Sequence, residues 1–135
     1  MRSIFEITNK MDFDPAALEK MKALATETLS NAKVGQYTQA IILFSESEAL
    51  YGAVIENALS QERKDERELL EKLKTNDDTR IRYCLCMWQD GGIDIPSVAF
   101  RKMLCDLNKE NSNSVLLIKT LDGIAGMELG ATMKA

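Results

Sequence analysis

The sequence contains no histidine, and this absence excludes more chemistry than any other feature of its composition. Histidine is the commonest general base in enzymes and the commonest nitrogen ligand of zinc. Acid–base catalysis or metal binding by this chain must therefore rely on carboxylates, thiols or other groups. Cysteine is also scarce: Cys84, Cys86 and Cys105 form an odd set of three, which argues against the disulfide framework of a secreted protein.

Long apolar runs and basic runs are absent as well. No stretch approaches the roughly 20 apolar residues that span a bilayer, and the start, MRSIFEITNK, lacks the apolar core of a signal peptide. We therefore expect no membrane association and a cytoplasmic location. The formal net charge is -4, and no basic run is long enough to follow a phosphate backbone. Nucleic acid is thus not an expected partner.

The composition that remains is that of a globular chain. Hydrophobic residues make up 45% of the 135 residues and charged residues 28%, a balance typical of one ordinary core. There is no internal repeat, low-complexity segment or linker. We expect a single domain over residues 1–135.

Helical and strand patterns alternate along the chain. Asp14 and Pro15 predict a helix start, and apolar residues at helical spacing extend that helix over 15–33. Further helices are predicted over 60–75 and 95–107, the latter with Val98 and Leu104 facing inward. Strands are predicted over 39–44, 49–55, 79–88, 115–120 and 124–129. This order favours a three-layer α/β/α sandwich with a mixed five-stranded sheet.

The predicted strand over 79–88 alternates between two faces. Ile81, Tyr83, Leu85 and Met87 share one face, and Arg82, Cys84, Cys86 and Trp88 share the other. Cysteine is among the most frequently buried residues, and no third or fourth metal ligand accompanies this pair. We expect Cys84 and Cys86 to pack in the core as small apolar side chains.

Four segments in this order resemble the cytidine deaminase superfamily. They are LYGAVIENA (50–58), DERELLEKL (65–73), IPSVAFRKMLCDL (95–107) and IKTLDG (118–123). The resemblance covers residues 14–129 and implies the zinc-dependent nucleoside deaminase fold. In that family a histidine or cysteine and two further cysteines hold zinc, and a glutamate moves protons between the zinc-bound water and the base.

The metal ligands that the resemblance implies are missing here. The family's P-C-x-x-C-R helix reads Pro96-Ser97-Val98-Ala99-Phe100-Arg101, so both cysteines are replaced. Serine is a poor zinc ligand at neutral pH and phenylalanine cannot bind a metal. We therefore expect no metal site and no cofactor, although zinc is the family's cofactor.

The other half of the motif aligns in two ways. Matching Glu66-Arg67 to the family's Glu-Arg puts Lys64 at the first ligand position and Glu66 at the catalytic carboxylate. An ungapped match puts Asp65 at the ligand position and Arg67 at the carboxylate; we prefer the first because it keeps the helical register. Without zinc Glu66 has no activated water to serve. We expect it to be a solvated residue in the charged run ERKDERE (62–68), at a relic catalytic position.

The family's sugar-binding segment is partly retained. Glu56 and Asn57 match its Glu-Asn pair and are candidate substrate-binding residues, while Val54 replaces a ribose-contacting asparagine. A turn role for both residues is the alternative. The family also implies a homodimer or homotetramer.

Three functional hypotheses follow. The first is a deaminase-like chain that has lost zinc and hydrolysis and persists as a module binding a nucleoside-like small molecule or a protein. The second is an active nucleoside deaminase-type hydrolase with an altered metal site, in which Glu62, Asp65 and Glu66 bind another cation. The third is an interaction subunit whose likeness to the family is one of fold alone.

Overall fold

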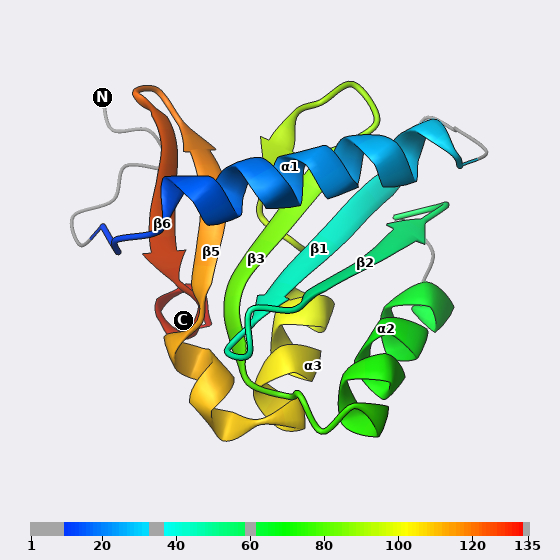
Figure 1. Cartoon of the computed structure of the whole chain (residues 1–135), viewed down its shortest axis with the longest axis vertical. Coiled ribbons are helices and arrows are strands. Elements are labelled where there is room, and N and C mark those ends of the chain that lie inside the picture. Colours follow the sequence, from blue (N-terminus) through cyan, green and yellow to red (C-terminus); the bar gives the residue numbers. More distant parts are fainter. Residues whose placement is uncertain (1–9, 33–36, 59–61, 134–135) are drawn as a thin grey trace.

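A computed structural model describes residues 10–32, 37–58 and 62–133, and Figure 1 shows a twisted sheet with helices on both of its faces. The helices are α1 (Pro15–Ser30), α2 (Lys64–Thr75), α3 (Val98–Leu107) and α4 (Leu129–Thr132), with a 3-10 turn η1 (Lys109–Asn113). The strands are β1 (Gln39–Ser45), β2 (Leu50–Ile55), β3 (Ile81–Trp88), β4 (Ile93–Asp94), β5 (Val115–Thr120) and β6 (Gly123–Glu128). In the part of the chain described, no helix is long and apolar enough to cross a membrane.

The sheet is mixed, as predicted, and its strand order is β2-β1-β3-β5-β6. β1 pairs antiparallel with both β2 and β3, β3 pairs parallel with β5, and β5 pairs antiparallel with β6. The short β4 pairs with β3 and makes a sixth strand that the sequence pattern did not indicate. β2 and β3 run in the same direction, but they do not pair with each other, because β1 lies between them.

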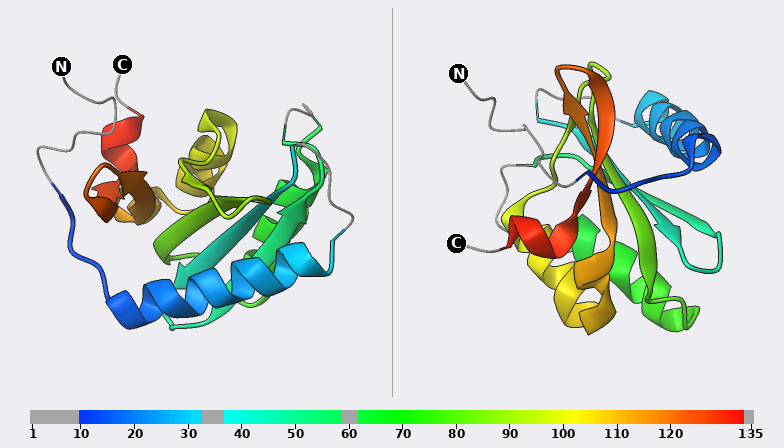
Figure 2. Two further views of the ribbon diagram at one scale, coloured as in Figure 1. Left: turned by 90° about the horizontal axis from the view of Figure 1, so that it is seen from above. Right: turned by 90° about the vertical axis from the view of Figure 1, so that its left-hand side faces the viewer.

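Three layers enclose two cores. Helix α1 covers one face of the sheet, and α2 and α3 cover the other (Figure 2). Side chains of α1 pack against Ile42, Tyr83 and Leu85. On the opposite face, Leu69 and Leu73 of α2 pack with Cys84 and Cys86. The predicted three-layer α/β/α sandwich and the predicted core packing of both cysteines are confirmed.

Two helices begin later than their patterns predict. Helix α2 begins at Lys64, directly after Arg63, whose left-handed backbone conformation with φ 56° is not helical; residues 60 and 61 of the predicted helix lie outside the described ranges. Helix α3 begins at Val98 because the Ser97 side chain caps it, so Pro96 precedes the cap. Val98 is 60% exposed, so its predicted inward position is wrong, and Phe100 occupies the core instead.

At the first residue of β3, the side chains depart from the predicted alternation between the two faces of the sheet. The pairing of β1 with β3 shifts register between Phe44 and Ser45, so that Ser45 lies opposite Ile81. Ile81 therefore packs in the α2/α3 core with Cys84, and not with Tyr83. Arg82 is exposed.

Candidate functional site

The candidate site lies where β2 ends and α2 begins. A cavity of about 280 Å³ is lined by the end of β2, the residues just after it and the first turn of α2. Glu56 and Asn57, both exposed, line this cavity together with Glu66. The structure thus brings together all three candidate site residues from two separate segments. Val54, which aligns with an asparagine in the family that the sequence resembles, is half-buried on β2 and is not among the lining residues.

Glu66 is buried and ion-paired. Its side chain is 2% exposed, and Arg63 Nη1 donates a hydrogen bond to Glu66 Oε1 at 3.1 Å. The prediction of a solvated Glu66 is therefore wrong. A buried carboxylate is costly unless a partner compensates it, and the Arg63 side chain, 22% exposed, is that partner.

The helical periodicity of α2 explains why one acidic side chain, Glu66, is buried within a run of seven charged residues (62–68). Glu66 and Leu69 are on the buried face of the helix, while Lys64, Arg67 and Glu68 are exposed. Helical periodicity thus directs one charge of the run inward and leaves its neighbours in water. Negative side chains in the first turn also interact favourably with the helix dipole, and Asp65 and Glu66 occupy that turn.

At the start of α3, Ser97 and Phe100, which align with the two cysteines of the family that the sequence resembles, both have structural contacts. Ser97 Oγ accepts a hydrogen bond from the backbone N–H of Phe100 at 3.1 Å and caps the helix. Phe100 is fully buried and packs in the α2/α3 core. Neither side chain is arranged to hold a metal.

Arg101, which matches the family's arginine, connects two helices. Its Nε donates to the carbonyl of Pro96 at 3.0 Å, and its Nη1 donates to the carbonyl of Thr132 at 3.2 Å. Burial lowers the pKa of the guanidinium from its ordinary value. The arginine therefore ties the start of α3 to the end of α4.

The thiols near this site are protonated at neutral pH. Burial raises the pKa of Cys84 to about 12. Burial also raises the pKa of Cys86 well above 9.0, with smaller contributions from the charges of Cys84, Asp94 and Glu66. Metal binding and nucleophilic attack both need the thiolate, so neither thiol is suited to them.

The residues present do not fit the family's zinc. Within the described ranges no group of three or more acidic or cysteine side chains is placed to hold a metal ion. Glu62, Asp65 and Glu66 do line the same cavity, but Glu66 is engaged by Arg63. The side chains that line this cavity therefore offer zinc neither the thiolates nor the imidazole with which the family binds it.

Two side-chain pairs, Trp88 with Asp94 and Arg63 with Glu66, were not predicted from the sequence. Trp88 Nε1 donates to Asp94 Oδ2 at 3.1 Å, which fixes β4 against the end of β3. The i,i+3 spacing of Arg63 and Glu66 was a readable signal for their ion pair. The bond between Trp88 and Asp94 follows from the turn at Gly91 and Gly92, whose closure the sequence pattern did not define.

Comparison with solved structures assigns the fold. The chain is similar to cytidine deaminase from Mycobacterium leprae, with TM-score 0.65 and 15% identity over 87% of this chain and 98% of that one. The enzyme from Mycobacterium tuberculosis gives 0.62 and 16% over 90% and 94%. The enzyme from Burkholderia pseudomallei gives 0.62 and 12% over 84% and 93%. No protein-family model and no curated protein sequence matches the chain.

These likenesses define the class of the molecule as a three-layer α/β/α sandwich with a mixed sheet. More particularly, the fold is similar to that of these cytidine deaminases, in agreement with the fold that the resemblance of the four sequence segments implies.

Proposed function

We propose that the protein binds a nucleoside-like small molecule in the cavity beside Glu56, Asn57 and Glu66, and that it no longer performs zinc-dependent deamination. The observation that supports this proposal is that a buried carboxylate lines the cavity, whereas the two residues that align with the family's cysteines stabilise α3 and the core. Glu66 is 2% exposed and paired with Arg63, whereas Ser97 caps α3 and Phe100 fills the core.

Burial also supports the preferred alignment of the motif. Glu66 points into the protein and Arg67 is exposed, so Glu66 corresponds to the family's inward carboxylate. Lys64 then stands at the first ligand position, and it is exposed. The alternative alignment puts an exposed arginine at the catalytic position and has no such support.

Glu56 and Asn57 provide the polar contacts to the ligand in this proposal. Both are exposed and reachable from the cavity, and a carboxylate and an amide together accept and donate hydrogen bonds to hydroxyl groups. The neighbouring Arg63 and Glu66 are occupied with each other. The ligand is therefore recognised at the rim, by its sugar-like hydroxyls.

Two measurements on the same sample test this function. Elemental mass spectrometry on protein purified without chelator or affinity metal should find less than about a tenth of an equivalent of transition metal. Calorimetric titration with cytidine, uridine and adenosine should give binding that Glu56→Gln weakens. Hydrolytic release of ammonia from cytidine by metal-loaded protein would contradict the proposal.

A second candidate is a hydrolase with an altered, oxygen-rich metal site. Its support is that Glu62, Asp65 and Glu66 line one cavity; among the described residues they do not form a group placed to hold a metal ion, so a cation would have to displace Arg63 from Glu66. Carboxylate oxygens are suitable ligands for Mg²⁺ or Mn²⁺. About one equivalent of such a cation, lost in Asp65→Asn and accompanied by turnover, would favour this candidate over the first.

A further inference from the structure

A groove distinct from the candidate site lies between β2 and α2, two elements that pack side by side (Figure 1). Its volume is about 470 Å³, which is within the range of small-molecule sites. Tyr51 of β2 and Asn76, the residue after α2, line it, and we call it the Tyr51 groove. The other lining residues all belong to α2: Lys64, Arg67, Glu68, Glu71, Lys72 and Thr75.

The Tyr51 groove has an excess of positive charge. Its two lysines and its arginine are exposed, and none of the three forms an ion pair with a carboxylate in the described ranges. Of the two acids in the lining, Glu71 pairs with Lys74 at 3.3 Å, so only Glu68 opposes the three cations. The groove is therefore locally positive on a chain whose net charge is -4.

Local helix energetics does not favour these cations where they stand. Lys64 and Arg67 are three residues apart at the start of α2, so two like charges are neighbours on one helix face and repel each other. They also lie near the positive end of the helix dipole. Departures of this kind from local preference are expected at functional sites. An anionic ligand in the groove would compensate both unfavourable terms.

Hydrogen bonds fix the aromatic wall of the groove. The Tyr51 hydroxyl donates to Asp78 Oδ2 at 2.8 Å, and Asn76 Nδ2 donates to the Tyr51 hydroxyl at 3.3 Å. Because both bonds engage the hydroxyl, the ring is the part of Tyr51 that remains for a ligand. A rigid aromatic side chain offers a large apolar contact at little entropic cost. The groove thus combines positive charge with an apolar wall.

We propose that the Tyr51 groove is a second ligand site, independent of the proposed function, which binds a small phosphate monoester with an aromatic body. Such a phosphate carries a charge near −2 at neutral pH. Arg67 stands between the two lysines along α2, and its guanidinium can donate two parallel N–H groups to the phosphate oxygens. The aromatic body packs against the Tyr51 ring.

The charges of the candidate site direct this ligand to the groove. Glu56, Glu62 and Asp65 line the candidate cavity, and these carboxylates repel a phosphate. Lys64 lines both the cavity and the groove, so the two sites adjoin each other but differ in sign. The groove therefore selects an anion that the cavity disfavours.

Amide chemical-shift mapping tests the site and the class of ligand. Phenyl phosphate is titrated to about 10 mM into isotope-labelled protein at low salt, where the attraction between charges is least screened. The shifts should saturate with a Kd below about 3 mM and should concentrate at Tyr51 and over residues 64–76. Inorganic phosphate has the charge without the ring and should bind at least about threefold more weakly. Unsaturated shifts, shifts concentrated elsewhere, or equal affinity for both probes would overturn the proposal.

Three variants test the role of charge. Arg67→Gln removes the central cation and should weaken phenyl phosphate binding at least about fivefold. Glu68→Gln removes the opposing acid and should tighten binding about twofold, an improvement that a damaged fold does not produce. Lys119→Gln removes an exposed lysine of β5, which two strands separate from β2, and is the matched control with unchanged Kd. Wild-type affinity in Arg67→Gln, or no gain in Glu68→Gln, contradicts the proposal.

Discussion

Arg63 Nη1 lies 3.1 Å from Glu66 Oε1, and this contact between a left-handed residue and a fully helical one defines how α2 begins. The left-handed conformation costs a non-glycine residue about 1–2 kcal/mol. The conformation directs the guanidinium toward the buried carboxylate three residues later. The strained backbone of Arg63 therefore places the guanidinium where it compensates the buried charge of Glu66.

Arg63→Ala should destabilise the protein by about 3 kcal/mol, because it leaves the Glu66 carboxylate buried without its partner. The measurement is urea unfolding at neutral pH. Lys74→Ala is the matched control, since Lys74 pairs with Glu71 in the same helix at the same i,i+3 spacing, but both side chains are more than half exposed. That change should cost less than about 0.5 kcal/mol. Equal losses in the two variants would contradict our account of Glu66.

Cysteines placed at positions 97 and 100, where the family that the sequence resembles has them, should weaken the fold. Ser97→Cys removes the capping hydroxyl and should cost about 1 kcal/mol. Phe100→Cys leaves a cavity in the α2/α3 core and should cost about 3 kcal/mol. Val98→Ala, at the exposed position between them, is the control and should be nearly neutral in thermal unfolding. A stable Phe100→Cys variant would show that the core around α3 repacks.

Asp78 should make stability depend on pH in the acid range. Burial raises the pKa of its carboxyl, but hydrogen bonds from Ser45, Tyr51 and Ser47 outweigh burial and leave the pKa below 3.8. Because the folded-state pKa is lowered, the stabilisation is present above the unfolded-state value and is lost as pH falls through the folded-state value.

Asp78→Asn should therefore cost about 2 kcal/mol at neutral pH, and the difference from wild type should shrink below about pH 4. Urea unfolding at several pH values measures this difference. Asp77→Asn changes an exposed neighbour and should follow wild type throughout. A difference between Asp78→Asn and wild type that stays constant with pH would contradict the role of the charge.

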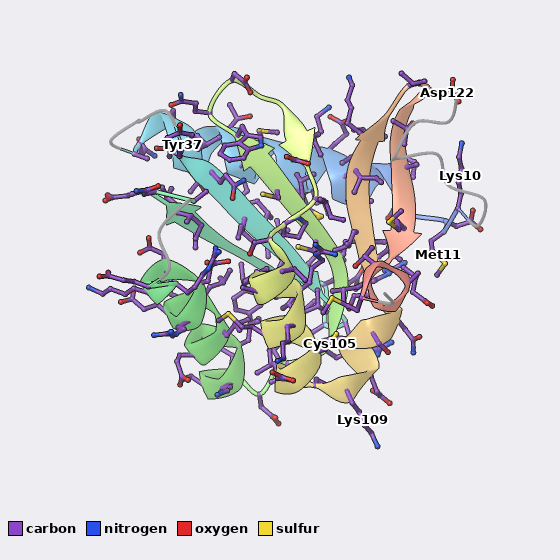
Figure 3. All side chains as sticks on the ribbon, turned by 180° about the vertical axis from the view of Figure 1, so that it is seen from behind. Lys10, Met11, Tyr37, Cys105, Lys109 and Asp122 are labelled. Carbon is purple, nitrogen blue, oxygen red and sulfur yellow. The ribbon has the colours of Figure 1, made fainter. Side chains whose placement is uncertain are left out.

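The three thiols should differ in accessibility. Cys84 and Cys86 are completely buried, while Cys105 is partly exposed on α3, where Figure 3 labels it. Ellman's reagent at about pH 8 should therefore react with Cys105 alone in the folded protein and with all three thiols in denaturant. The reaction should be slow, since burial and the neighbouring Asp106 raise the pKa of Cys105. Cys105→Ser should abolish reaction in the folded state, and residual reaction there would mean that the sheet opens.

The order of helices and strands and the three layers could be predicted from the amino-acid sequence, and the sequence also shows directly that histidine is absent. Periodicity and motif spacing are local properties, and they are readable wherever neighbouring residues decide the outcome. Short motifs also singled out Glu56, Asn57 and Glu66, which line one cavity in the structure.

The tertiary structure alone decided the environments of these residues. Glu66 is buried because Arg63 turns back toward it, and Ile81 changes face because β1 shifts register opposite it. Phe100 enters the core because Ser97 sets where α3 begins. Each outcome depends on the backbone conformation of one residue or on pairing between distant strands, and a periodic pattern contains neither. The edge position of β2 among the described strands likewise follows from pairing between distant segments.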